Sequence, residues 1–141
     1  MDNQLFLAFD YGERRTGVAI GQSLTLSAQP LETISAIQNM PDWKKIESII
    51  SEWKPVQIVV GIPDNSSQNK ALRKKIYDFC NQLTSKFNLP VVTHDETLSS
   101  DAAYRYLKSK RQVSKGKINK QDIDKISAAV LLESWMNSNI P

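Results

Sequence analysis

The 141-residue sequence predicts one α/β domain, residues 1–141, in which helices flank a mixed β-sheet in the order βββαβαβαα. Two observations support this fold class. Three apolar segments follow one another across short turns at the start of the chain, which is typical of antiparallel strands. The later strands are separated by amphipathic helices, and a helix is the usual crossover between parallel neighbours. We therefore expect antiparallel strands first and parallel strands later.

The antiparallel half consists of three segments. Residues 4–10 and 16–22 are apolar runs joined by a short turn, and residues 27–34 supply a third strand. Pro30 has no N–H group to donate to a neighbouring strand, so the third strand should be an edge strand or an irregular one.

Helices and strands alternate in the rest of the chain. Apolar residues at spacings of three and four predict a helix that begins near Asp42 and ends before Pro55. The elements expected after it are a strand at 57–61, a helix at 68–87, a strand at 90–96, a helix from Ser99 or Ser100 to about 107, and a last helix at 119–137.

The composition excludes several kinds of site. The chain has one cysteine, Cys80, and one histidine, His94, which is too few for a zinc cluster, a disulfide framework or a Cys–His dyad. Cys80 is expected in the core and His94 in a structural strand position. No apolar run approaches the roughly 18 residues of a membrane span, and no basic stretch precedes an apolar segment at the amino terminus. We expect a cytoplasmic protein that contacts no membrane.

The positive charge is concentrated in one segment. Residues 108–120 contain six basic residues and no acidic residue, whereas the whole chain has a net charge of only +3. Such a segment is either an ordinary solvated surface or a binding surface for a polyanion such as nucleic acid.

Acidic residues fall at three places that the predicted topology brings to one rim. Asp10 ends the first strand, Asp95 and Glu96 end the last strand, and Asp124 lies one turn inside the last helix. The carboxyl ends of parallel strands lie along one edge of a sheet, where ligands usually bind. Asp10 and one of the Asp95–Glu96 pair are therefore expected to meet there.

Small side chains should let the last helix join this rim. Ser127 and Ala128 share the helical face of Asp124, so the helix can approach the sheet closely. Three converging carboxylates suit metal-assisted phosphoryl transfer, because Mg²⁺ prefers oxygen ligands and two ions about 4 Å apart can activate water and stabilise a leaving oxygen. Taken singly, each acid is more simply a strand end or a solvated helix residue.

Four sequence blocks resemble one known family. Residues 9–19 are similar to the Asp-aromatic-Gly-x-(Lys/Arg)-Arg-x-Gly-Val-Ala opening of the YqgF family, also called the RuvX or pre-16S rRNA nuclease family. Residues 59–63, 94–99 and 123–129 resemble that family's later motifs in the same order. The resemblance implies an RNase H-like fold akin to Holliday-junction resolvases. It also implies a cytoplasmic hydrolase that processes the 5′ end of pre-16S rRNA.

The resemblance also implies roles for individual residues. Asp10, Glu96 and Asp124 would be the catalytic ligands of Mg²⁺ or Mn²⁺, with two ions expected, and Asp95 is the weaker candidate ligand. Thr97 stands where the family commonly has arginine, which removes a bidentate phosphate donor. The residues that would hold nucleic acid are Arg14, Arg15, Lys110, Arg111, Lys115, Lys117 and Lys120.

Other functions stay open at this point. A resolvase of Holliday junctions or branched DNA, and a nucleic-acid-binding module without catalysis, both fit the sequence, because fold does not fix function. An actin-like phosphotransferase is less favoured, since those enzymes close two such domains over ATP. A homodimer is also left open.

Several further residues have simpler expected roles. Gly12 and Gly17 are expected to adopt positive φ angles in the turn between the first two strands. Trp43, Trp53 and Trp135 recur at helical spacings and are expected to pack in the core rather than stack on bases. Tyr11, beside Asp10, is the aromatic residue placed best to stack on a nucleotide.

Overall fold

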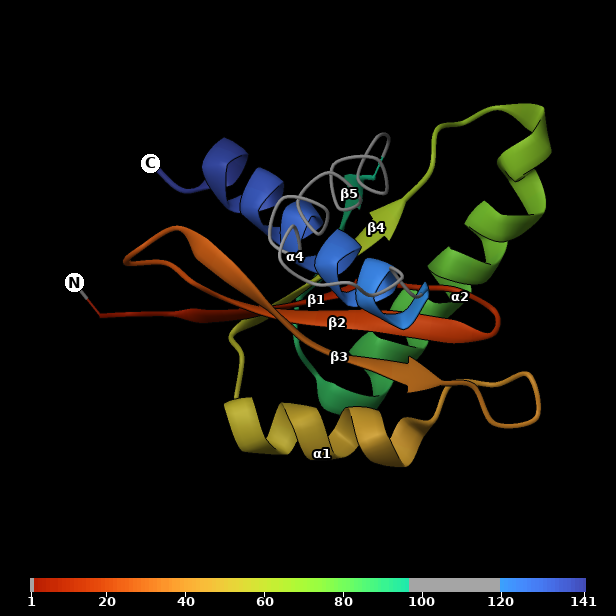
Figure 1. The fold of residues 1–141 in the computed structure, drawn as a ribbon, viewed down its shortest axis with the longest axis horizontal. Helices are drawn as coiled ribbons and strands as arrows, with labels where there is room; N and C mark the ends of the chain where they lie inside the picture. The colour runs from red at the N-terminus through yellow and green to blue at the C-terminus, as the bar shows by residue number, and fades with distance from the viewer. Residues whose placement is uncertain (1, 97–119) are drawn as a thin grey trace, which may run out of the picture.

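A computed structural model of the chain describes residues 2–96 and 120–141. They form a five-stranded mixed sheet in the order β3-β2-β1-β4-β5, with helices on both faces (Figure 1). The strands are β1 (Leu5–Asp10), β2 (Arg15–Gln22), β3 (Ser27–Ser35), β4 (Gln57–Ile62) and β5 (Val91–Asp95), the α-helices are α1 (Trp43–Trp53), α2 (Lys70–Phe87) and α4 (Lys120–Asn139), and a 3₁₀ turn spans Ser67–Asn69. The predicted mixed α/β sheet is confirmed. The helix expected at 99–107 lies outside the described residues.

The strand pairing has the predicted directions. β1 pairs antiparallel with β2, and β2 pairs antiparallel with β3, whereas β1, β4 and β5 run parallel. β3 is an edge strand, as Pro30 predicts. The register shifts where Val18 faces Glu32 and Ala19 faces Pro30, so the strand bulges at Leu31 beside the proline.

Alternation along β1 divides the core between the two faces of the sheet. Leu7 and Phe9 join the apolar cluster formed with α1 and α2, whereas Phe6 and Ala8 join the cluster formed with α4. Because side chains alternate in a strand, Asp10 continues the α4 side and Tyr11 continues the α1–α2 side. One strand end thus presents a carboxylate to one face and an aromatic ring to the other.

Two helix boundaries follow from local chemistry. The Asp42 side chain accepts a hydrogen bond from the Lys45 N–H group at 3.3 Å and caps α1. Lys54 ends α1 in the left-handed conformation immediately before Pro55, and the Lys54 N–H group donates to the Ile50 carbonyl.

The single cysteine and the single histidine lie at the predicted positions, in the core and in a strand. Cys80 is buried in the cluster under α2, and burial raises the pKa of its thiol to about 11, so the thiolate is scarce at neutral pH. His94 Nε2 lies 3.0 Å from the Ser134 hydroxyl, which joins β5 to α4. No helix in the described part of the chain is long and apolar enough to cross a bilayer.

The role expected for the turn glycines is wrong. None of the described glycines has a positive φ angle. Gly17 lies within β2, opposite Asp10, and a Cβ atom there would lie 2.0 Å from the Asp124 carbonyl oxygen. At Gly12 a Cβ atom would lie 2.4 Å from the Arg15 carbonyl oxygen. Both positions need glycine because another backbone approaches closely, and at Gly17 that backbone belongs to α4.

Candidate active site

The three predicted carboxylates lie at the same edge of the sheet. Asp10 is the last residue of β1, Glu96 follows β5, and Asp124 lies in the second turn of α4. The Glu96 N–H group donates to the Ile62 carbonyl at 3.0 Å, which extends the parallel pairing of β5 with β4 by one residue. The side chains of Asp10 and Glu96 are hydrogen-bonded to each other, and the charge of Asp124 acts on Asp10.

Two glycines make room for this arrangement, and sequence reasoning did not find this role for them. A Cβ atom at Gly61 in β4 would lie 2.8 Å from Glu96 Oε2, so a larger residue would require that carboxyl group to shift from its place beside Asp10. Gly17 admits the backbone of α4 at Asp124. The available signal was a glycine inside an apolar strand, which often marks a close approach of another group.

Burial and mutual repulsion set the protonation of the pair. Burial is the main cause that raises the pKa of Asp10 well above its ordinary value, followed by the charge of Glu96, their hydrogen bond and the charge of Asp124. Burial also raises the pKa of Glu96, and Asp95 adds to the rise while the hydrogen bond from Asp10 opposes it. Both shifts favour the protonated form of the pair when no cation is bound, and a proton shared between the two carboxyl groups accounts for the hydrogen bond between them.

Asp124 is held by an arginine rather than by the carboxyl pair. Arg15 Nε lies 2.8 Å from Asp124 Oδ2, and the two side chains are 30% and 24% exposed. Within residues 2–96 and 120–141, no three acidic, histidine or cysteine side chains are arranged so that they could hold a metal ion. The site therefore consists of a carboxyl pair, Asp10 and Glu96, with an ion pair, Arg15 and Asp124, beside it.

Some of the other predicted site residues are exposed near the site, and the structure does not describe the side chains of the rest. Asp95 is exposed at the end of β5, and Arg14 is exposed in the turn before β2. Lys120 begins α4, but its side chain is outside what the structure describes. Thr97 and the other residues predicted to hold nucleic acid lie outside the described residues: Lys110, Arg111, Lys115 and Lys117.

The carboxyl pair predicts an unusual pH dependence of stability in the absence of divalent cations. Because the pKa values of Asp10 and Glu96 are raised in the folded protein, the folded state binds more protons than the unfolded chain between the ordinary and the raised pKa values. This stabilisation is complete at pH values below the ordinary pKa of a carboxyl group. It is lost as the pH rises through the raised pKa values of Asp10 and Glu96. Asp10→Asn should therefore increase the free energy of unfolding at pH 7 by the order of 1 kcal/mol, or about 4 °C in Tm.

Urea unfolding of both proteins in EDTA, at several pH values, measures this effect. Hydrogen bonds from Lys75 and Ser66 lower the pKa values of Glu13 and Asp64. These two groups therefore make the free energy of unfolding change with pH in the opposite direction, and they do so equally in both proteins. Only the difference in the free energy of unfolding between the wild type and Asp10→Asn isolates the contribution of the Asp10–Glu96 pair. A difference that stays constant with pH would contradict the prediction.

The chain is similar to known proteins of one family over nearly its whole length. The family model described as "RuvX: Holliday junction resolvase" matches residues 4–138. A protein of Wigglesworthia glossinidia brevipalpis named "Putative pre-16S rRNA nuclease" is 42% identical over 139 residues, with 96% of this chain and 94% of the relative covered. A protein of Pseudomonas putida with the same name is 40% identical, with 98% of each chain covered.

Two solved structures have a similar fold, although their sequence identity to this chain is much lower. RuvC of T. thermophilus, in complex with a Holliday junction substrate, matches with a TM-score of 0.59 and 13% identity over 97% of this chain and 96% of that chain. The Fowlpox virus resolvase, in complex with Holliday junction DNA, matches with a TM-score of 0.58 and 16% identity over 98% and 100%. At these identities the likeness shows the fold, and it confirms the RNase H-like architecture that the sequence predicts.

Proposed function

The chain belongs to the RuvX family, and from this premise we propose that it is a divalent-metal-dependent nuclease that cleaves the 5′ end of pre-16S rRNA in the cytoplasm. The observation that carries this proposal is the hydrogen-bonded pair of Asp10 and Glu96 at the carboxyl edge of the parallel strands, with Asp124 beside it. The names of the relatives at 40–42% identity support RNA as the substrate.

The carboxyl pair fits a hard divalent cation in its donor chemistry. Metal dependence is general among nucleases of this fold family. Asp10 and Glu96 place oxygen atoms together in a partly buried site, and their shared proton is the group that a cation would replace. Mg²⁺ or Mn²⁺ bound there would polarise the scissile phosphate and activate a water molecule.

Asp10 and Glu96 would be the first ligands, and Asp124 the third. In the metal-free arrangement Asp124 is bonded to Arg15, so its recruitment requires this ion pair to loosen. A phosphate near Arg15 would compete with Asp124 for the guanidinium, which binds phosphate and carboxylate oxygens in the same way. Arg15 therefore links the arrival of substrate to the release of the third carboxylate.

Basic residues would position the nucleic acid around this site. Arg14 and Arg15 lie at the turn that leads from Asp10 into β2, close to the proposed scissile phosphate. The basic segment at 108–120 would add sequence-independent phosphate contacts, which favour binding at low salt. We assign Lys110, Arg111, Lys115, Lys117 and Lys120 to this role.

One observation favours a second substrate. The matching family model carries the description of a Holliday junction resolvase. Branched DNA is therefore the alternative substrate for the same carboxylates, and the chemistry of the phosphodiester cleavage would be unchanged.

A parallel cleavage assay tests the proposal and separates the two substrates. The purified protein is incubated with an end-labelled RNA that spans the 5′ end of pre-16S rRNA, or with a four-way DNA junction, in Mg²⁺ or in EDTA. We expect discrete RNA products in Mg²⁺ and none in EDTA. Products from the junction alone would move the assignment to branched DNA, and cleavage that persists in EDTA would refute metal dependence.

A further inference from the structure

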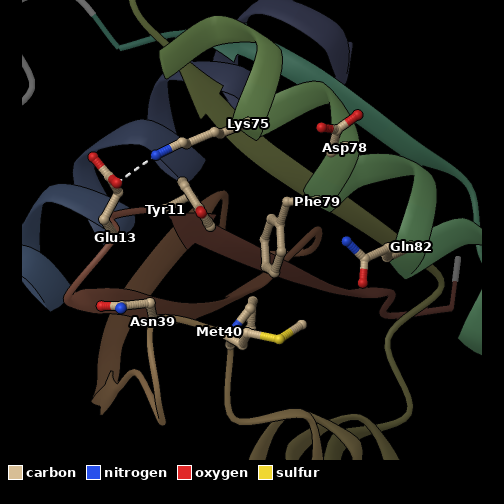
Figure 2. A pocket seen from close by; sticks show the side chains of 9 residues that line it. Tyr11, Glu13, Asn39, Met40, Lys75, Asp78, Phe79 and Gln82 are labelled. Atoms are coloured by element: carbon tan, nitrogen blue, oxygen red, sulfur yellow. Dashed lines mark hydrogen bonds and ion pairs between the residues drawn. The ribbon is translucent and has the colours of Figure 1, made fainter. Parts of the chain in front are cut away.

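A cavity of about 510 Å³ opens at Tyr11, the residue after Asp10, on the face of the sheet that α1 and α2 cover. Figure 2 shows the side chains that line it. Tyr11 and Glu13 of the β1–β2 turn, residues 39–41 and one face of α2 line it. We propose that this cavity binds one unpaired base of the nucleic-acid substrate, next to the phosphate at Asp10. The inference rests on the proposed nuclease function and adds to it a binding site for a single nucleotide.

An aromatic wall supplies the stacking surface. The Tyr11 ring lies 5.0 Å from the Phe79 ring, centroid to centroid, and Tyr11 is partly exposed. Phe79 is only 1% exposed and is held by Phe9 at 5.5 Å and Trp43 at 5.6 Å. Tyr11 therefore rests on a rigid aromatic cluster, and a base stacked on its free surface would meet a ring that is already fixed.

A tight turn forms the opposite wall. Gln38 and Asn39 both have positive φ angles, as the two central residues of a type I′ turn do. Two reciprocal backbone hydrogen bonds, of 2.8 and 3.0 Å, join Ile37 and Met40 across this turn. They hold Met40, which is 56% exposed, at the mouth of the cavity. An exposed thioether beside aromatic rings is a suitable contact for a flat, polarizable base.

The polar groups of the cavity match a base better than a phosphate. Figure 2 shows the Lys75–Glu13 ion pair on one side and Gln82 on the other, with Asn39 near the turn. The amides of Asn39 and Gln82 each offer a donor and an acceptor, as base edges require. Glu13 and Asp78 against Lys75 leave a net charge of −1, which disfavours an anionic group inside.

The position of Tyr11 connects this cavity to the cleavage site. Asp10 and Tyr11 are consecutive, so their Cα atoms are about 3.8 Å apart, and their side chains point to opposite faces of the sheet. A single strand that crosses the carboxyl end of β1 can therefore present a phosphate to Asp10 and a neighbouring base to Tyr11. Only an unpaired nucleotide can turn its base into such a cavity, because a paired base stays in its stack.

Binding of two labelled octamers in EDTA tests the proposal without any cleavage. One octamer is oligoadenylate, and the other has the same ribose-phosphate backbone without bases. Fluorescence anisotropy should show that Tyr11→Ala weakens oligoadenylate binding about tenfold, which is within the usual range for the loss of one stacked base. The same variant should change binding of the abasic octamer less than twofold, because the phosphate contacts remain.

Matched variants distinguish stacking from a change in folding. Tyr11→Phe keeps the ring and should bind oligoadenylate as the wild type does. Tyr77→Ala removes a tyrosine that is 46% exposed on α2 and does not line the cavity, and its binding should be unchanged. Equal losses for both octamers, no loss with Tyr11→Ala, or no binding of oligoadenylate by the wild type would each overturn the proposal. Cleavage that fails while these results hold would count against the nuclease function alone.

Discussion

Asp10→Asn is expected to lower the rate of phosphodiester cleavage by about 10³-fold while the fold is kept. Asparagine preserves the size and hydrogen-bonding capacity of the side chain but removes the charge that a divalent cation requires. Loss of one preorganised electrostatic contribution commonly costs about 10²–10³ in rate, and here the ligand and its charge are lost together. Single-turnover cleavage of the RNA precursor in saturating Mg²⁺ measures the effect, and circular dichroism checks the fold.

Asp95→Asn is the matched control for this experiment. It removes the same charge within the same short segment, but Asp95 is exposed whereas the Asp10 carboxyl is desolvated and bonded to Glu96. We expect its cleavage rate to fall less than about threefold, as for an exposed charge near a site. Similar losses in the two variants would show that net negative charge, rather than a specific ligand, controls cleavage, and full activity of Asp10→Asn would remove Asp10 from the site.

Much of this site could be predicted because it depends on the ends of elements. Asp10 ends the first strand and the Asp95–Glu96 pair ends the last one, and the rule that parallel strands share a carboxyl edge brings Asp10 and one of that pair together without knowledge of side-chain packing. The resemblance to the family then selects Glu96 from the pair. The edge position of β3 follows equally from one residue, because Pro30 cannot donate a ladder hydrogen bond. Such inferences need only the backbone direction and the chemistry of one side chain.

The features that sequence reasoning missed depend on distances between elements. The ion pair of Arg15 with Asp124 joins residues 109 positions apart, and nothing in either local pattern selects this partner. The cavity beside Tyr11 forms from a turn, a loop and a helix whose spacing is fixed only by the packed core. The positive φ expected at Gly17 was wrong because the same residue type serves both turns and close contacts.

Gly17→Ala therefore separates these two roles for glycine. The φ angle of Gly17 is not in the left-handed region, and at such positions alanine usually stabilises a protein by about 0.4–1 kcal/mol through the unfolded chain. Here the new Cβ atom would lie 2.0 Å from the carbonyl oxygen and 2.3 Å from the carbonyl carbon of Asp124. These are backbone atoms, so no side-chain rotation relieves the clash, and α4 must move away from β2.

We expect Gly17→Ala to lower the free energy of unfolding by about 3 kcal/mol, the upper end for overpacking, which corresponds to about 10 °C in Tm for a chain of this size. Cleavage should fall in the folded fraction as well, because the displaced backbone carries Asp124. Urea unfolding and cleavage below the Tm of the variant measure the two effects separately.

Gly21→Ala in the same strand is the matched control, because its Cβ atom would meet the methyl ends of Leu132 and Met136 at 2.8 and 2.9 Å. These flexible ends can rotate away, so the cost should be about 1 kcal/mol with cleavage retained. If Gly17→Ala were as stable as the wild type, the backbone of α4 at Asp124 would not lie as close to Gly17 of β2 as the structure shows. If the two variants lost equal stability, side-chain crowding alone would explain both, and the approach of Asp124 to Asp10 would no longer depend on glycine.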